Sequence, residues 1–199
     1  NSVITIGCGI LTYCSMVDSI TIPASVSNIV GTFDSWGLDN ITVDKNNKYY
    51  SSDDGVLFNK TKTELIQYPP DNYRESYSIP SSVKKIGDCA FKDAPVSNVI
   101  IPDTVEVIGE GAFRFSNIET VYIPAGVKSV GDGCFLECKQ LKSIRIPGSV
   151  KEISMQFCLG CKNLAEVILE EGIETIKWNA FESCESISEV IIPASVKTI

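Results

Sequence analysis

The chain has no histidine, and this absence removes several kinds of catalytic and metal site. Ser-His-Asp and Cys-His nucleophile systems need an imidazole as general base. No glycine-rich phosphate loop occurs, and Asp53-Asp54-Gly55 offers too few oxygen ligands for a calcium loop. The sequence therefore predicts a non-catalytic protein that uses no cofactor.

Positive charge and long apolar runs are also scarce. The 17 Lys and Arg residues are outnumbered by 25 Asp and Glu residues, which gives a net charge of −8. Without a basic cluster, neither nucleic acid nor an anionic membrane is an expected partner. No apolar run approaches the roughly 20 residues of a membrane helix, and no signal peptide is present. Because the sequence starts without Met and stops in mid-pattern, we expect a fragment of a longer protein.

What the chain has instead is an internal repeat. The dipeptide Ile-Pro recurs at Ile22-Pro23, Ile79-Pro80, Ile101-Pro102, Ile123-Pro124, Ile146-Pro147 and Ile192-Pro193. From Ile79 onward the steps are 22 or 23 residues, with Leu169-Glu170 in the place of one copy. Each copy continues with two aliphatic residues spaced by three, then commonly a Gly, then Ala-Phe or a relative, and then a small residue. A fixed period of this length is typical of a solenoid.

The spacing within one copy predicts its local structure. The apolar residues before each Ile-Pro alternate with polar ones, which favours a strand with one buried face. The proline ends that strand, because it cannot donate to a ladder. A second short extended segment follows, and the Ala-Phe segment has room for one helical or 3-10 turn. So short a unit buries its apolar face only by stacking, so we expect seven to eight repeats with parallel strands.

The pattern Leu-x-x-Ile-x-Ile-Pro-x-x-Val-x-x-Ile-Gly-x-x-Ala-Phe-x-x-Cys resembles the BspA-type leucine-rich repeats of bacterial and protist surface proteins. Its cleanest copies are 141–161 and 164–184. The resemblance implies a leucine-rich repeat solenoid with a parallel sheet on its concave face. It also implies an extracellular or cell-surface protein that adheres to an unknown protein or host-surface ligand. We expect residues 1–199 to form a single such domain.

Residues 44–78 interrupt the period. Val56-Leu57-Phe58 and the run from Leu65 to Tyr68 are strand-like, and the polar stretch between them predicts a β-hairpin. Insertions in solenoids often mark a binding surface, whereas the alternative is a widened repeat with a structural role alone. The candidate insertion surface comprises Tyr49, Tyr50, Asp53 and Asp54.

The cysteines resemble a zinc site in spacing. Cys134-x₃-Cys138 and Cys158-x₂-Cys161 lie near the spacing of a four-cysteine site, and eight cysteines in a secreted chain would commonly form disulfides. All four occupy repeat positions that hold Ala, Phe or another small residue elsewhere, so we predict that they pack in the core. Disulfides between stacked copies fit poorly, because adjacent strands lie about 4.8 Å apart. The oxidation state of Cys8 and Cys14 stays open.

One column of outward-facing strand residues is unexpectedly apolar. In each main strand, the residue between the last two inward positions must face outward. We predict a protein-binding strip of Ile100, Tyr122, Arg145, Ile168 and Ile191. A second outward column is polar and contains Asn98, Thr120, Ser143 and Glu166. The alternative is that β-branched and aromatic residues merely suit strands, in a passive spacer or assembly module of a larger surface protein.

Overall fold

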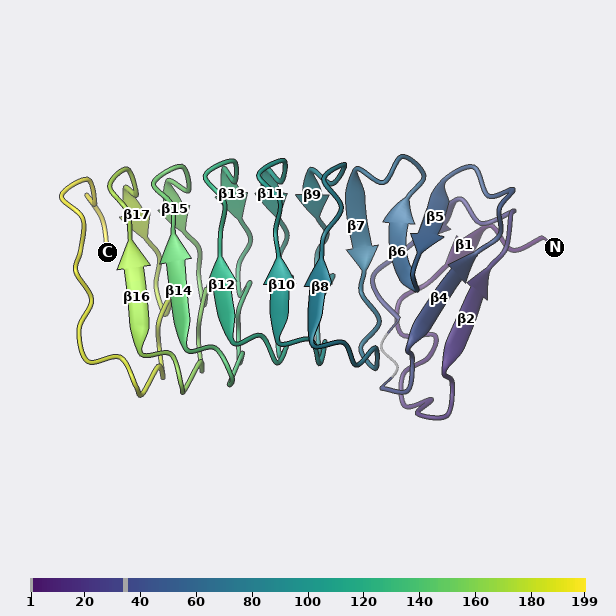
Figure 1. Cartoon of the computed structure of the whole chain (residues 1–199), viewed down its shortest axis with the longest axis horizontal. Helices are drawn as coiled ribbons and strands as arrows, with labels where there is room; N and C mark the ends of the chain where they lie inside the picture. Colours follow the sequence, from purple (N-terminus) through teal and green to yellow (C-terminus); the bar gives the residue numbers. More distant parts are fainter. Residues whose placement is uncertain (1, 34–35) are drawn as a thin grey trace.

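The computed structural model describes residues 2–33 and 36–199. They form a β-solenoid of about eight turns, whose coils stack along the long axis with the chain ends at opposite ends of the stack (Figure 1). The central feature is a five-stranded sheet in which all neighbours are parallel, in the order β16-β14-β12-β10-β8. Its strands are β8 (Ser76–Ser78), β10 (Asn98–Ile100), β12 (Thr120–Tyr122), β14 (Ser143–Ile146) and β16 (Glu166–Leu169).

A six-stranded sheet contains the second short strands of the first regular coils. Its order is β13-β11-β9-β7-β6-β5, and the remaining strands form three two-stranded sheets, β1-β3, β2-β4 and β15-β17. The six strands are β5 (Tyr50–Asp53), β6 (Val56–Asn59), β7 (Glu64–Gln67), β9 (Lys85–Ile86), β11 (Val107–Ile108) and β13 (Ser129–Val130). The others are β1 (Thr5–Ile6), β2 (Ser19–Ile22), β3 (Asn28–Ile29), β4 (Asn40–Val43), β15 (Glu152–Ile153) and β17 (Thr175–Ile176).

The turns between the second strands and the next coil differ from the single helical or 3-10 turn that the spacing predicts. In the regular coils from Cys89 onward, two residues of each turn are left-handed, for example Cys89 (φ 54°) and Asp93 (φ 59°). No helix is present within residues 2–33 and 36–199. Alternate N–H groups donate to the next coil: Cys89 to the oxygen of Glu110 at 2.8 Å, Phe91 to that of Ala112 at 2.6 Å and Asp93 to that of Arg114 at 3.0 Å. The residues between them donate back within the turn, as Lys92 does to Cys89.

A stack of phenylalanine rings lies under these turns. Phe91, Phe113 and Phe135 are stacked face to face at centroid distances of 5.0 and 5.2 Å. The next ring, Phe157, meets Phe135 edge-on at 69°. The sequence accounts for this change, because the order Cys134-Phe135 is reversed to Phe157-Cys158 in the following copy. Both arrangements are favourable for aromatic pairs.

The interruption of the repeat forms an antiparallel meander. β6 pairs with β7, which is the hairpin that the sequence predicts, and β5 adds a third strand on the other side of β6. β7 then pairs in parallel with β9 and so joins the meander to the regular coils. The strand β5 was not predicted, because Tyr50-Ser51-Ser52-Asp53 has little apolar character.

The strand β6 separates two hydrophobic cores. Val56, Leu57 and Phe58 are all fully buried, whereas a regular strand of this solenoid buries only alternate residues. Val56 and Phe58 belong to the main core, which extends to Cys184. Leu57 belongs to a smaller N-terminal core with Ile6, Ile22, Val26, Phe33, Leu38 and Ile41. The meander therefore lies between the two hydrophobic cores.

Candidate functional site

Four of the five residues of the predicted strip lie side by side on the five-stranded sheet. Ile100 ends β10, Tyr122 ends β12, Arg145 lies within β14 and Ile168 within β16. Tyr122 is in register with Arg145, and Arg145 with Ile168. Ile191 lies beyond the last strand, in the segment that follows Cys184. Neighbouring strands are about 4.8 Å apart, so five adjacent positions span about 20 Å.

The side chains of the strip are exposed while their chain neighbours are buried. Ile100, Tyr122, Ile168 and Ile191 are 55%, 61%, 41% and 76% exposed, and Arg145 is exposed as well. The residues that precede the strip positions in the four strands all point into the core: Val99, Val121, Ile144 and Val167. The alternation of side chains along a strand therefore directs the strip to solvent, as the sequence predicts.

Arg145 is held by a neighbour that sequence reasoning missed. Its Nε atom donates to Glu170 Oε1 at 2.6 Å, and one of its Nη atoms lies within ion-pair distance of the same oxygen. The other oxygen of Glu170 accepts from the N–H of Gly148 at 3.4 Å. Glu170 occupies the place of proline in its copy of the repeat, which is the signal that could have revealed it. The strip consequently presents a neutralised, oriented guanidinium in its middle.

The C-terminal end of the strip opens into a cleft. Ile168 and Ile191 line a hollow of about 470 Å³ between β16 and the segment 188–191. The polar column beside the strip contributes Glu166 to the same hollow. The cleft therefore adjoins the strip at Ile168 and Ile191, and its lining includes both apolar and acidic side chains.

The residues of the candidate insertion surface do not form one cluster. Tyr49 is exposed, whereas the side chain of Tyr50 packs on the N-terminal core. The hydroxyl of Tyr50 accepts a hydrogen bond from the N–H of Ile29 at 3.0 Å. Tyr50 therefore fastens β5 to β3. The two acids are paired within the protein, because Asp53 binds Lys62 at 2.6 Å and Asp54 binds Arg74.

Asp54 also lines a polar hollow of about 470 Å³ at the N-terminal end. Asp18, Asp39 and Asn40 line it together with Arg74. In the parts of the chain that the structure describes, no group of three or more His, Cys, Asp or Glu residues is arranged to hold a metal ion.

The cysteines that mimic a zinc site are part of the core, as the repeat register predicts. Cys134, Cys138, Cys158 and Cys161 are fully buried, and none of them is in a disulfide. The thiol of Cys138 donates to the oxygen of Phe113 at 2.9 Å, and that of Cys161 to the oxygen of Phe135 at 3.0 Å. Burial raises the pKa of Cys134 and Cys138 well above the ordinary value, so these groups stay protonated donors.

A membrane-spanning segment of the helical kind requires a long apolar helix. Within 2–33 and 36–199, no helix has the length and apolar character needed to cross a bilayer.

The chain is similar in fold to bacterial leucine-rich repeat proteins of known structure. A leucine-rich repeat protein from Eubacterium ventriosum ATCC 27560 matches 98% of this chain and 60% of its own, with a TM-score of 0.85 and 27% identity. The pneumococcal vaccine antigen PcpA matches 99% of this chain and 54% of its own, with a TM-score of 0.67 and 22% identity. A leucine-rich cell surface protein from Faecalibacterium prausnitzii A2-165 matches 95% of this chain and 56% of its own, with a TM-score of 0.62 and 20% identity.

This chain thus spans a little over half the length of each of these three relatives, and the latter two show the fold alone. No curated protein sequence matches it. The family model described as "BspA type Leucine rich repeat region" matches residues 1–72 and 71–188, in six copies. Matches over these two ranges cover nearly all of the coils described above. The chain therefore belongs to the BspA-type leucine-rich repeat family.

Proposed function

We propose that the chain is a non-catalytic binding segment of a secreted or cell-surface protein, and that it holds a protein partner on its five-stranded sheet. The observation that carries this proposal is the strip itself. Four large apolar side chains and one oriented arginine are exposed at adjacent positions on one face. Scattered exposed apolar residues are ordinary, but a continuous row rimmed by polar residues is typical of an interface.

The energetics of the strip are adequate for binding. Burying a fully exposed Ile or Tyr side chain contributes roughly 1.5–3 kcal/mol. Because the four side chains are 41–76% exposed, together they offer about 3–7 kcal/mol before the cost of association. A stable interface covers about 800 Å² on each partner, which is more than a 20 Å row provides. The polar column of Asn98, Thr120, Ser143 and Glu166 would supply the rim.

The proposed extracellular location rests on the similarity of the fold to two proteins of known structure. Two proteins of the same fold are described as a vaccine antigen and a cell surface protein. An extracellular or cell-surface site for this chain is consistent with that description and with a binding role toward host proteins.

A passive spacer is the second candidate, and the contacts between coils favour it. Ion pairs join successive coils along the outer surface, among them Lys128–Glu106, Lys142–Glu119, Lys177–Glu152 and Lys197–Glu174. Each exposed pair contributes about 0–1 kcal/mol, and together they link one coil to the next along the stack. A stiff rod suits a module that carries another domain away from a surface.

Surface plasmon resonance on the immobilised chain distinguishes the two functions. Purified host extracellular-matrix and serum proteins are passed over it, and at least one is expected to bind saturably. Tyr122→Ala and Ile168→Ser should then weaken that binding by tenfold or more. The matched control is Trp178→Ala, an exposed aromatic outside the sheet, which should leave binding unchanged. Saturable binding that is unaffected by the strip variants would contradict the role of the strip, and the absence of any binding would favour the spacer.

A further inference from the structure

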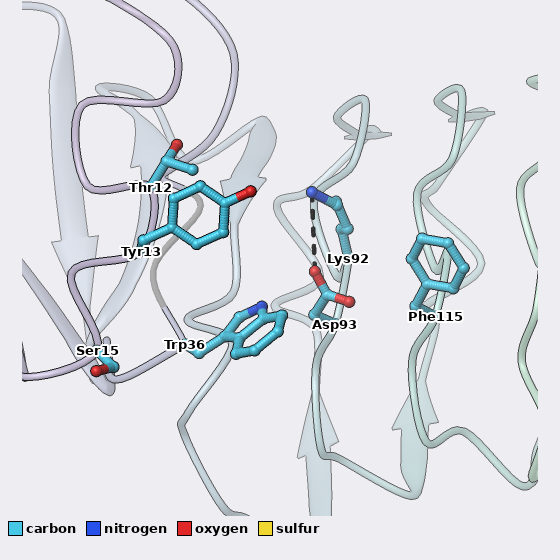
Figure 2. Close-up of a pocket in the computed structure, with 7 residues that line it drawn as sticks. All are labelled: Thr12, Tyr13, Ser15, Trp36, Lys92, Asp93 and Phe115. Atoms are coloured by element: carbon cyan, nitrogen blue, oxygen red, sulfur yellow. Dashed lines mark ion pairs between the residues drawn. The ribbon is translucent and has the colours of Figure 1, made fainter.

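A second hollow, of about 300 Å³, lies among the turns of the solenoid rather than on the five-stranded sheet. Figure 2 shows residues from three parts of the chain around it: the turn of Thr12, Tyr13 and Ser15, then Trp36, and then the turns of the first regular coils. Three aromatic side chains line it, and their exposed fractions are 94% for Tyr13, 75% for Trp36 and 39% for Phe115. Core packing does not account for aromatic rings that are this exposed.

Two of these rings stand on backbone that disfavours them. Tyr13 (φ 64°) and Phe115 (φ 60°) are left-handed residues. Both occupy the position before the small residue of the repeat, which other coils fill with Asp93, Glu137, Gly160 and Ser183, also left-handed. The fold thus imposes the conformation at this position, and Gly, Asn or Asp adopts it at least cost. Tyr13 is strained there and stays almost fully exposed, which points to a use outside folding. Phe115 is more buried, and the guanidinium of Arg114 lies 4.7 Å from the centre of its ring.

The polar groups of the hollow are balanced in charge. Lys92 Nζ lies 3.8 Å from a carboxylate oxygen of Asp93, and Figure 2 shows this ion pair between Trp36 and Phe115. Thr12 and Ser15 are polar residues of the same lining. The hydroxyl of Thr12 donates to the oxygen of Gly9, which leaves its own oxygen able to accept. Donors and acceptors therefore stand beside the aromatic faces with no net charge between Lys92 and Asp93.

This combination selects one kind of ligand. A pyranose ring has a face of C–H groups, which stacks on an aromatic ring, and an edge of hydroxyls, which both donate and accept. A charged ligand would compete with the Lys92–Asp93 ion pair, whereas a neutral polar ligand can form hydrogen bonds beside the pair without breaking it. The volume lies at the lower end for small-molecule sites, which fits one ring of a longer chain. We propose that this hollow binds a neutral sugar ring of an oligosaccharide.

The two tryptophans of the chain allow a direct test. Trp178→Phe leaves Trp36 as the only indole reporter. This reporter protein is titrated with maltotriose, cellotriose, chitotriose and xylotriose while Trp36 emission is recorded. At least one trisaccharide should change the emission saturably in the millimolar range. Tyr13→Ala and Phe115→Ala in the same background should weaken that binding at least tenfold.

Controls separate the proposal from non-specific effects. Tyr73→Ala removes an exposed tyrosine that does not line the hollow, and it should leave the titration unchanged. Far-ultraviolet circular dichroism checks that each variant is folded. The proposal is overturned if no trisaccharide gives a saturable change, or if the change is indifferent to Tyr13→Ala and Phe115→Ala. It is also overturned if a nonaproline peptide saturates the site and every trisaccharide fails, because the hollow would then be a peptide site.

Discussion

The side-chain amide of Gln67 forms two hydrogen bonds with the main chain of Phe33. Its oxygen accepts from the N–H of Phe33 at 2.8 Å, and its nitrogen donates to the carbonyl oxygen at 3.0 Å. Gln67 is buried and ends β7, whereas Phe33 belongs to the N-terminal core. One amide therefore satisfies both main-chain groups of a residue on the far side of the meander. This contact ties the two cores together at a point where the repeat register is lost.

We predict that Gln67→Leu lowers the free energy of unfolding by about 2–4 kcal/mol. The leucine keeps similar volume but leaves the N–H and carbonyl groups of Phe33 buried without partners, at about 1–3 kcal/mol each. Urea denaturation followed by circular dichroism measures the change. Gln140→Leu, on the exposed surface, is the matched control and should shift stability by less than about 0.5 kcal/mol. Equal effects of the two substitutions would contradict the role given to Gln67.

The two faces of β6 provide a second prediction. Leu57→Ala should loosen the N-terminal core and Phe58→Ala the main core, each at a cost of about 2–5 kcal/mol. Hydrogen exchange resolved by segment distinguishes them. Faster exchange is expected in β1 to β4 for Leu57→Ala and in β7, β9 and β11 for Phe58→Ala. Identical exchange patterns in the two variants would show that β6 does not separate the cores.

The buried thiols should be inert in the folded protein. Cys134, Cys138, Cys158 and Cys161 have no solvent contact, and burial raises the pKa of Cys134, Cys138 and Cys158 and keeps them protonated. At pH 8 a thiol reagent is expected to label Cys8, which is exposed, while these four react only in urea. Mass spectrometry of peptides from labelled protein identifies the modified residues. Rapid labelling of Cys138 without denaturant would mean that the core opens at that coil.

Alkaline pH should destabilise the solenoid through another cysteine of the core, Cys184. Burial raises the pKa of Cys184 to about 11, above the ordinary value of about 9. The unfolded thiol then ionises first, so stability is fully present below pH 9 and is lost as pH rises toward 11. Comparing wild type with Cys184→Ala by urea denaturation at pH 7, 8, 9 and 10 isolates the contribution of Cys184 to the pH dependence of stability. The stability difference between the two proteins should be constant up to about pH 8 and then change. A pH-independent difference would argue against the raised pKa.

The sequence predicted the strands well because their residues carry a strong local signal. The alternation around Val99, Val121 and Ile144, followed by proline, determines which side chains face inward. The register of the cysteines followed from the same period, and it was enough to place them in the core. Sequence alone could therefore predict the coils and the outward direction of the strip.

Other features depend on contacts between coils and carry no local signal. The left-handed backbone at Phe115 is set by its N–H bond to Leu136 in the next coil, and not by any preference of phenylalanine. The partner of Arg145 lies 25 residues away and outside the strand pattern. The approach of Trp36 to Tyr13 depends on how two coils stack, so it could not be predicted. For this reason the aromatic hollow was absent from the sequence-based hypotheses.

The turns give this stack a direction. Along that side, each regular coil from Cys89 onward donates N–H groups to the coil that follows and accepts at its carbonyl oxygens from the coil before. Cys89, Phe91 and Asp93 donate in this way to Glu110, Ala112 and Arg114. Two copies joined end to end by a twofold axis would set donors against donors, or acceptors against acceptors. Only a head-to-tail junction pairs them, and a junction of that kind is heterologous and does not close after two copies. On the side of its turns, further coils can be added to the solenoid head to tail, but two copies related by a twofold axis cannot pair their backbone groups there.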